Sequence, residues 1–184
     1  MIEQEIKLAF DSVEAARQAV TTAGGRLVVA RRLIRDQLFD TPDRRLGASD
    51  RTCRLRREAD QAILTFKGPT LPGPVKRREE TETVVNDADA VSTVLAGLGF
   101  EPTFRSEKYR EEYAIAGAEV TVDETPVGVF VEIEGTPETI EAITRALGRT
   151  PADYRLESYP RLYMAWCAAR GRTPTHMTFE STSA

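Results

Sequence analysis

The stretch MIEQEIKLA (residues 1–9) carries the alternation around which the chain is organised. Successive side chains of a β-strand point to opposite faces, so Glu3, Glu5 and Lys7 share one face and the intervening apolar residues share the other. One such strand is ordinary in a sheet with a solvated face. The interpretation therefore depends on whether later strands repeat the pattern.

Charged residues recur at the same two-residue spacing in later extended segments. Arg54 and Arg56 flank Leu55, and Glu132 and Glu134 flank Ile133. The bases that we place on this charged face are Lys7, Arg54, Arg56, Lys67, Arg78, Lys108 and Arg110. The acids are Glu3, Glu5, Glu80, Glu82, Asp123, Glu132 and Glu134. A sheet that repeats one charged face in strand after strand requires a partner for that face.

Composition limits the possible classes of protein. The chain has 184 residues, 41% hydrophobic and 29% charged, which fits one domain with a real core. The formal net charge of −4 argues against a general nucleic-acid-binding surface. Cys53 and Cys167 are far apart and His176 is the single histidine, so neither a zinc site nor a Cys-His catalytic pair is expected.

Nothing in the sequence indicates export or a membrane anchor. Carboxylates occupy the N-terminal positions where a signal peptide would carry basic and then apolar residues. No apolar run approaches the ~18 residues that a membrane-spanning helix needs. We therefore expect a cytoplasmic protein with no membrane partner.

The order of predicted elements repeats. A strand over 1–10 precedes a helix begun by Asp11 and ended by Gly24, an extended stretch over 26–39, and a hairpin of 52–58 with 62–67. A strand over 75–85, a helix capped by Asn86 and Asp87, an extended stretch over 100–114 and a hairpin of 119–123 with 127–134 follow the same order. Two further helices begin at Thr136 and Ser158, and the polar tail 171–184 is predicted to be disordered.

Every predicted helix has one apolar side, and every strand has an apolar face opposite its charged one. Helices packed on the outside of a curved sheet satisfy both, and the charged faces then point inward. Unpaired charge in a dry interior costs too much free energy, so this interior must be wet, internally paired or filled by a charged ligand. Two alternatives remain: an internal ion-pair lattice without a ligand, and an open sheet whose charged face is solvated.

The residue types on the inner face suggest what it binds. The planar guanidinium group of arginine presents paired donors that match phosphate oxygens. The large number of basic residues on this face suits a polyphosphate better than a monophosphate. Carboxylates repel phosphate unless Mg²⁺ or Mn²⁺ bridges them, and Glu3, Glu5, Glu132 and Glu134 are the natural ligands. No GxxxxGK[ST] and no GxGxxG after a strand is present, so side chains would have to hold any triphosphate.

The ordered set of motifs resembles the CYTH domain, the triphosphate tunnel metalloenzyme family. Glu3-x-Glu5-x-Lys7 resembles its ExExK signature, Phe39-Asp40-Thr41 its aromatic-Asp-Thr turn and Arg54-x-Arg56 its Arg-x-Arg strand. Matches continue, in the family's order, through Lys67, Arg78 with Glu80 and Glu82, Lys108-x-Arg110, Asp123 and Glu132-x-Glu134. The resemblance covers about residues 1–166, and we expect one CYTH domain over 1–170.

The resemblance implies an α+β fold: an eight-stranded antiparallel β-barrel forming a tunnel, with helices packed outside. It also implies a Mg²⁺- or Mn²⁺-dependent enzyme that cleaves a triphosphate. The residues implied to bind the triphosphate are Lys7, Arg54, Arg56, Lys67, Arg78, Lys108, Arg110 and, from a connector, Arg155. The implied metal ligands are Glu3, Glu5, Asp123, Glu132 and Glu134, with Glu80 and Glu82 as further tunnel acids. Glu5 and Lys7 are the implied catalytic residues, Lys7 as a base if neighbouring cations lower its pKa.

The family includes class IV adenylate cyclases, thiamine triphosphatases and inorganic triphosphatases, so the reaction is less determined than the fold. We favour hydrolysis of tripolyphosphate or a small organic triphosphate, because the His-Phe pair that precedes ExExK in some cyclases is absent. The alternatives are an adenylate cyclase that makes cyclic AMP and pyrophosphate, and a non-catalytic polyphosphate-binding module. The expected partner is a small triphosphate rather than nucleic acid, and the protein is expected to be a monomer or homodimer.

Overall fold

The computed structural model describes residues 2–58 and 61–182. The first half of the chain contains β1 (Ile2–Phe10), α1 (Val13–Thr22), β2 (Arg26–Asp40), α2 (Arg45–Ala48), β3 (Thr52–Glu58) and β4 (Gln61–Lys67). The rest of the chain contains β5 (Lys76–Val85), α3 (Ala88–Gly97), β6 (Glu101–Ile115), β7 (Ala118–Thr125), β8 (Gly128–Glu134), α4 (Pro137–Ala146), a 3₁₀ turn (Pro151–Asp153), α5 (Tyr159–Ala168) and α6 (Phe179–Thr182).

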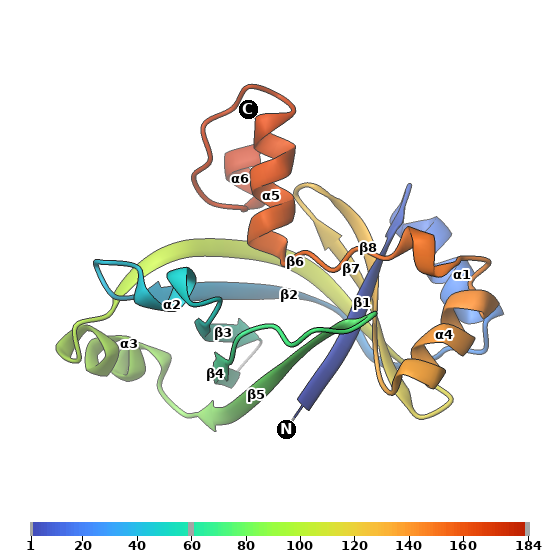
Figure 1. Cartoon of the computed structure of the whole chain (residues 1–184), viewed down its shortest axis with the longest axis horizontal. Helices are drawn as coiled ribbons and strands as arrows, with labels where there is room; N and C mark the ends of the chain where they lie inside the picture. Colours follow the sequence, from blue (N-terminus) through green and yellow to red (C-terminus); the bar gives the residue numbers. More distant parts are fainter. Residues whose placement is uncertain (1, 59–60, 183–184) are drawn as a thin grey trace.

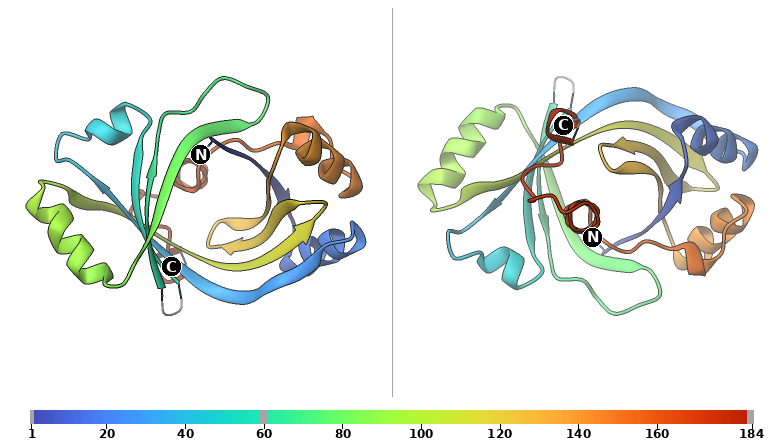
Figure 2. Two further views of the ribbon diagram at one scale, coloured as in Figure 1. Left: turned by 90° about the horizontal axis from the view of Figure 1, so that it is seen from below. Right: turned by 90° about the horizontal axis from the view of Figure 1, so that it is seen from above.

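The strands close into one antiparallel barrel in the order β1-β5-β4-β3-β2-β6-β7-β8. Each repeat of strand, helix, long strand and hairpin supplies four strands of the ring, and the repeats meet at the β1–β5, β4–β5, β2–β6 and β1–β8 pairs. Views along the barrel show the strands surrounding an opening, with α1, α3 and α4 outside it (Figure 2). The eight-stranded barrel with outer helices is confirmed, and the alternative of an open sheet is wrong.

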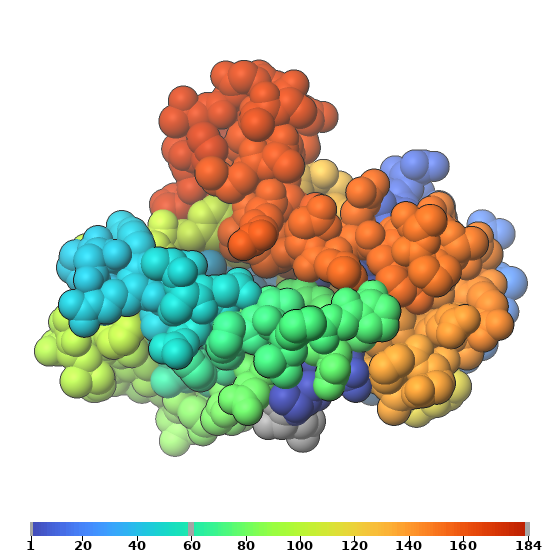
Figure 3. Space-filling view, in the orientation of Figure 1, coloured from blue at the N-terminus to red at the C-terminus, as the bar shows by residue number. Residues whose placement is uncertain are grey.

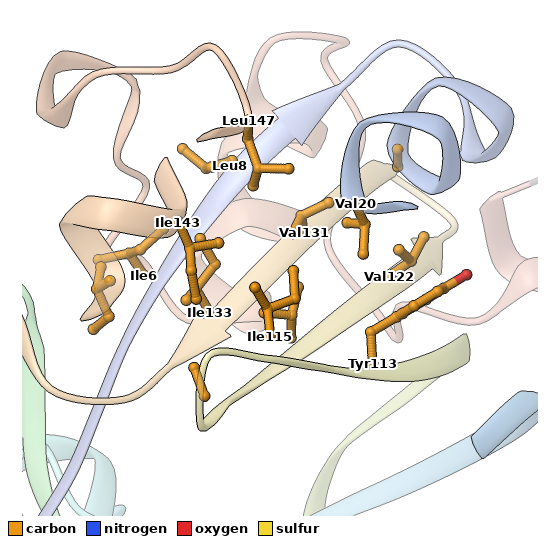
Figure 4. Packing of buried hydrophobic residues seen from close by; sticks show 14 of the residues in the cluster. Ile6, Leu8, Val20, Tyr113, Ile115, Val122, Val131, Ile133, Ile143 and Leu147 are labelled. Atoms are coloured by element: carbon orange, nitrogen blue, oxygen red, sulfur yellow. The ribbon is translucent and has the colours of Figure 1, made fainter. Parts of the chain in front are cut away.

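The largest apolar core lies between one side of the barrel and two helices. Ile6, Val131 and Ile133 from β1 and β8 are fully buried against Val20 of α1 and Ile140 of α4. Figure 4 shows the strand side chains of this core, Ile6 and Ile133 among them, together with Val20 of α1 and Ile143 of α4. Because alternate residues point away from this core, the charged residues of β1 and β8 must face the barrel interior.

Local sequence explains where the helices begin. Thr136 accepts a hydrogen bond from Thr139 N with Pro137 at the first position of α4, and Asp87 caps α3, as predicted. The cap of α1 is Ser12 rather than Asp11, because the Ser12 hydroxyl accepts from Ala15 N. The short helix α2 after the Asp40 turn was not predicted, and the Asp40 carboxylate organises it by accepting from Leu46 N and Gly47 N.

The tail is ordered through residue 182, contrary to the prediction of disorder, and residues 183–184 lie outside the described part. Met177 exchanges backbone hydrogen bonds with β6, donating to Arg105 O at 3.0 Å and accepting from Glu107 N at 2.9 Å. Its side chain is buried with Tyr163 and Cys167. Composition identified the stretch as polar but could not reveal that strand β6 and helix α5 bind it.

Helices α5 and α6 rise together at one end of the barrel, opposite the end where β1 begins (Figures 1 and 3). The first turn of α5 contributes Tyr159, Pro160 and Arg161 to the lining of the interior cavity. No helix in residues 2–58 or 61–182 combines the length and apolar character needed to cross a membrane.

Candidate functional site

A cavity of about 960 Å³ occupies the barrel interior, a volume in the range of small-molecule sites. Strand alternation brings the predicted residues of β1, β3, β4, β5, β6 and β8 to its wall. The predicted site residues that line it are Glu3, Glu5, Lys7, Arg54, Arg56, Lys67, Arg78, Glu80, Glu82, Lys108, Arg110, Glu132 and Glu134.

Two predicted site residues lie elsewhere. The Arg155 side chain is exposed and outside the cavity lining, because the connector pairs with β1 through its backbone, Arg155 N donating to Lys7 O at 2.8 Å. Asp123 is fully buried behind the lining, where it accepts from Lys108 at 2.7 Å, Arg110 at 2.6 Å and Tyr159 at 2.7 Å. Asp123 is therefore placed to orient these cationic side chains, and its role as a metal ligand stays a prediction.

The cations of the wall are held by ion pairs. Arg56 forms a two-pronged pair with Asp36 at 2.8 and 3.0 Å, and Arg54 contacts Glu82 at 2.9 Å. Lys67 contacts Glu3 at 2.8 Å and Glu80 at 2.7 Å. These pairs make the internal lattice that one alternative proposed, but they line a cavity rather than fill the interior.

The prediction that Lys7 acts as a base is not supported. Burial alone would lower the pKa of Lys7, but the carboxylates of Glu132 at 3.1 Å and Glu5 at 3.2 Å outweigh it and raise the pKa above its usual value. Lys7 therefore stays protonated. Lys108 behaves differently, since burial and the neighbouring Arg110 lower its pKa to about 8.

Carboxylates gather on adjacent strands. Glu5 of β1 lies opposite Glu134 of β8, and Glu134 lies opposite Glu119 of β7. Partial burial, together with Glu3, Glu119 and Glu5, raises the pKa of Glu134 to about 7. Directly opposed like charges are destabilising. A divalent cation would relieve that repulsion, and the oxygen donors fit Mg²⁺ or Mn²⁺.

The carboxylate oxygens of this group do not converge on one point. Within the described ranges, no three acidic, histidine or cysteine side chains form a group close enough to hold a metal ion. Glu3 and Glu5 are instead paired with lysines. Glutamate side chains have three rotatable torsions, so convergence requires rotation of the side chains without movement of the strands.

Sequence reasoning missed several cavity residues. Lys76 and Glu119 could have been found, because each lies two residues before an inward-facing side chain on its own strand. Asp36 is embedded in the long β2 strand, and its role emerges only from its pairing with Arg56. Tyr159 lies on a helix, and its ring sits near the ammonium groups of Lys108 at 4.6 Å and Lys7 at 5.2 Å.

Comparisons with known proteins agree with this architecture. A family model described as CYTH domain matches residues 1–151. A protein of Methanocaldococcus jannaschii named "Putative adenylate cyclase" is 29% identical over 135 residues, which cover 73% of this chain and 77% of that protein.

Solved structures show the same fold. A structure from Vibrio parahaemolyticus, described as a "putative adenylate cyclase", has a TM-score of 0.77 at 21% identity, covering 88% of this chain and 97% of that one. One from Hippeastrum, described as a "putative adenylyl cyclase" that "reveals a dominant" triphosphatase activity, has a TM-score of 0.65 at 18% identity, covering 94% of this chain and 97% of that one.

Proposed function

This chain belongs to the CYTH domain family, and from that premise we propose that it is a Mg²⁺- or Mn²⁺-dependent triphosphatase. Its substrate would be tripolyphosphate or a small organic triphosphate, cleaved at the terminal phosphate inside the barrel. The observation that supports this most is a cavity that combines arginine forks with a row of carboxylates. A simple anion-binding module would need carboxylates only to hold its cations, and Glu119 and Glu134 form no ion pair among the described residues.

The basic residues would bind and orient the phosphate chain. Arg54, Arg56 and Arg110 offer planar guanidinium donors, and Lys7 and Lys108 supply further positive charge from the wall. Asp36 and Asp123 would fix the orientations of Arg56 and Arg110. In hydrolysis, water adds to the terminal phosphorus while the bridging P–O bond breaks, and these cations would stabilise the charge on the departing phosphate chain.

The acidic residues would hold the metal. We assign this role to Glu5 and Glu134, with Glu3 and Glu132 nearby, and the pairing of Glu5 with Glu134 across β1 and β8 supports the assignment. A bound divalent cation supplies charge neutralisation and Lewis-acid polarisation of phosphoryl oxygens. Since Lys7 remains protonated, we assign it to phosphate binding rather than to proton abstraction.

Adenylate cyclase activity is the second candidate, and the name of the archaeal relative favours it. The cavity lining is compatible with either reaction. Its apolar members are Leu38, Leu156 and Pro160, with Tyr159 beside them, and the other lining residues are charged or hydroxyl-bearing. The charged groups of that lining suit a phosphate chain, whether or not a nucleoside is attached to it.

A product assay with purified protein tests the proposal. Tripolyphosphate, ATP and thiamine triphosphate are offered with Mg²⁺ or Mn²⁺ at neutral and alkaline pH. Orthophosphate release is expected, with turnover reduced at least about 100-fold in Glu5→Gln, because the metal is held less well. Cyclic AMP and pyrophosphate from ATP would establish the cyclase instead. Tight tripolyphosphate binding without any product would identify a binding module.

A further inference from the structure

Tyr159, the first residue of α5, reaches the barrel interior from a helix rather than from a strand. It lies after residues 1–151, the part of the chain that the CYTH model matches. Its side chain lines the cavity, and its hydroxyl donates a hydrogen bond to Oδ2 of Asp123 at 2.7 Å. Helix α5 therefore contributes to the charged interior, although the helix itself rises from one end of the barrel (Figure 1).

The Asp123 carboxylate is the point at which this hydroxyl meets two cations of the wall. Its Oδ2 accepts from Lys108 Nζ at 2.7 Å and from Arg110 Nη2 at 2.6 Å, and its Oδ1 accepts from Arg110 Nε at 2.7 Å. A buried carboxylate requires hydrogen-bond donors, and the tyrosine hydroxyl is a donor without charge. Because that hydroxyl satisfies part of the carboxylate, more of the positive charge of Lys108 and Arg110 remains available to an anion in the cavity.

The ring of Tyr159 contacts the same part of the wall. Its centroid lies 4.6 Å from Lys108 Nζ and 5.2 Å from Lys7 Nζ, within the range of cation–π attraction. Phe130 of β8 packs edge-on against the ring, with the two centroids 5.8 Å apart and an interplanar angle of 73°. The ring thus restricts two lysine ammonium groups directly, while the hydroxyl acts on the wall through a carboxylate.

The C-terminal segment, residues 171–182, fixes α5 against β6, the strand that carries the two cations. Tyr163, one turn after Tyr159, is buried with Met177, and the Tyr163 hydroxyl accepts from Thr175 N at 3.1 Å. Met177 in turn exchanges backbone hydrogen bonds with β6. Packing outside the cavity therefore sets the position of Tyr159, and no ligand is needed to hold it there.

We propose that Tyr159 is a positioning residue for Lys108 and Arg110 in the phosphate-binding wall. Its hydroxyl acts through Asp123, and its ring acts on the lysine. This inference rests on the proposed function only in taking a phosphate chain as the ligand. Removing the hydroxyl should therefore change the affinity for a phosphate chain, although every cation of the wall is still present.

Calorimetric titration of the metal-free protein with tripolyphosphate tests the proposal. We expect about 3- to 10-fold weaker binding in Tyr159→Phe, which loses only the hydrogen bond to Asp123. Tyr159→Leu also loses the ring and should bind at least about 10-fold more weakly than the parent. Tyr154→Phe is the matched control and should bind as the parent does, because the Tyr154 hydroxyl accepts from Thr144 at 3.3 Å outside the cavity lining.

A double-mutant cycle separates positioning from a purely structural role of α5. In an Asp123→Asn background, Tyr159→Phe should weaken binding by less than about twofold, because the carboxylate through which the hydroxyl acts is gone. Thermal melting shows whether Asp123→Asn retains the fold. If it does not, Lys108→Met serves as the background, and the effect of Tyr159→Phe should again be smaller than in the parent.

Each contrary result has a distinct meaning. Additive effects in the cycle would show that Tyr159 only supports α5, and parent-like affinity in Tyr159→Leu would overturn the positioning role while leaving the proposed function intact. A parent protein that binds no tripolyphosphate would refute both this inference and the phosphate binding on which the proposed function depends.

Discussion

Two sides of the barrel differ in how the charged side chains of their inner faces are paired. The acidic wall, formed by β7, β8 and β1, places Glu119, Glu134 and Glu5 side by side. The basic wall, formed by β3, β4 and β5, carries arginines and lysines that alternate with Glu80 and Glu82 as partners. The acidic wall therefore contains unrelieved repulsion, whereas most charges on the basic wall offset one another.

The outer faces of the two walls differ in the extent of their apolar packing, which is greater behind the acidic wall. Behind the acidic wall, α1 and α4 cover a continuous apolar core (Figure 4). Behind the basic wall, the cluster around Leu55 and Leu95 is smaller, and Phe66 and Val84 remain 45% and 60% exposed. We infer that apolar packing holds the acidic wall in place against the repulsion on its inner face, whereas ion pairs contribute more to holding the basic wall.

The largest effect should come from removing support for the acidic wall. Ile133→Ala deletes a fully buried side chain from the core behind β8, and we expect a loss of about 2–5 kcal/mol in the free energy of unfolding. Val84→Ala on the basic wall should change it by less than about 0.5 kcal/mol, because that side chain is mostly exposed. Urea denaturation measures the free energy of unfolding of both variants. Equal losses would refute the inference that apolar packing supports the acidic wall more than the basic wall.

A second test addresses the inner face of the basic wall. Arg54→Ala and Arg56→Ala each remove charge-assisted hydrogen bonds to phosphate, and each should weaken tripolyphosphate binding by about 1.5–3 kcal/mol. Arg57→Ala is the matched control, since Arg57 lies on the outer face and pairs with Asp89. Calorimetry provides the affinities. Unchanged binding in both inner-face variants would show that the wall does not bind phosphate.

The smallest expected effect depends on pH. Lys108, on β6 between the two walls, has its pKa lowered to about 8 by burial and Arg110. It is therefore charged at pH 7 and largely neutral at pH 9, so metal-free tripolyphosphate binding should weaken several-fold across that interval. Lys108→Arg stays charged and should bind with less pH dependence. The ionisation of tripolyphosphate is common to both proteins, so identical pH profiles would exclude Lys108 as the titrating group.

Much of the barrel could be predicted from local pattern. Two-residue charge spacing identified the inner faces of β1, β3 and β8, and proline, glycine and capping residues located most helix ends. Predictions from local pattern were wrong where the structure or pKa of a residue depends on a contact with a residue distant in sequence. The tail is held against β6 by the backbone hydrogen bonds of Met177. The pKa of Lys7 is raised rather than lowered, because Glu132 lies opposite it across the β1–β8 pair.

The sequence by itself determined which side chains share the inner face, because a strand alternates its faces whatever surrounds it. It also carried the ordered motifs of the CYTH family. Only the tertiary structure decided which of those charges face one another. Register placed Glu119 beside Glu134, burial put Asp123 behind the cavity, and the connector's pairing with β1 left Arg155 outside. The physical reason is that alternation is local, whereas ion pairing, desolvation and cation binding depend on distances that closure of the barrel sets.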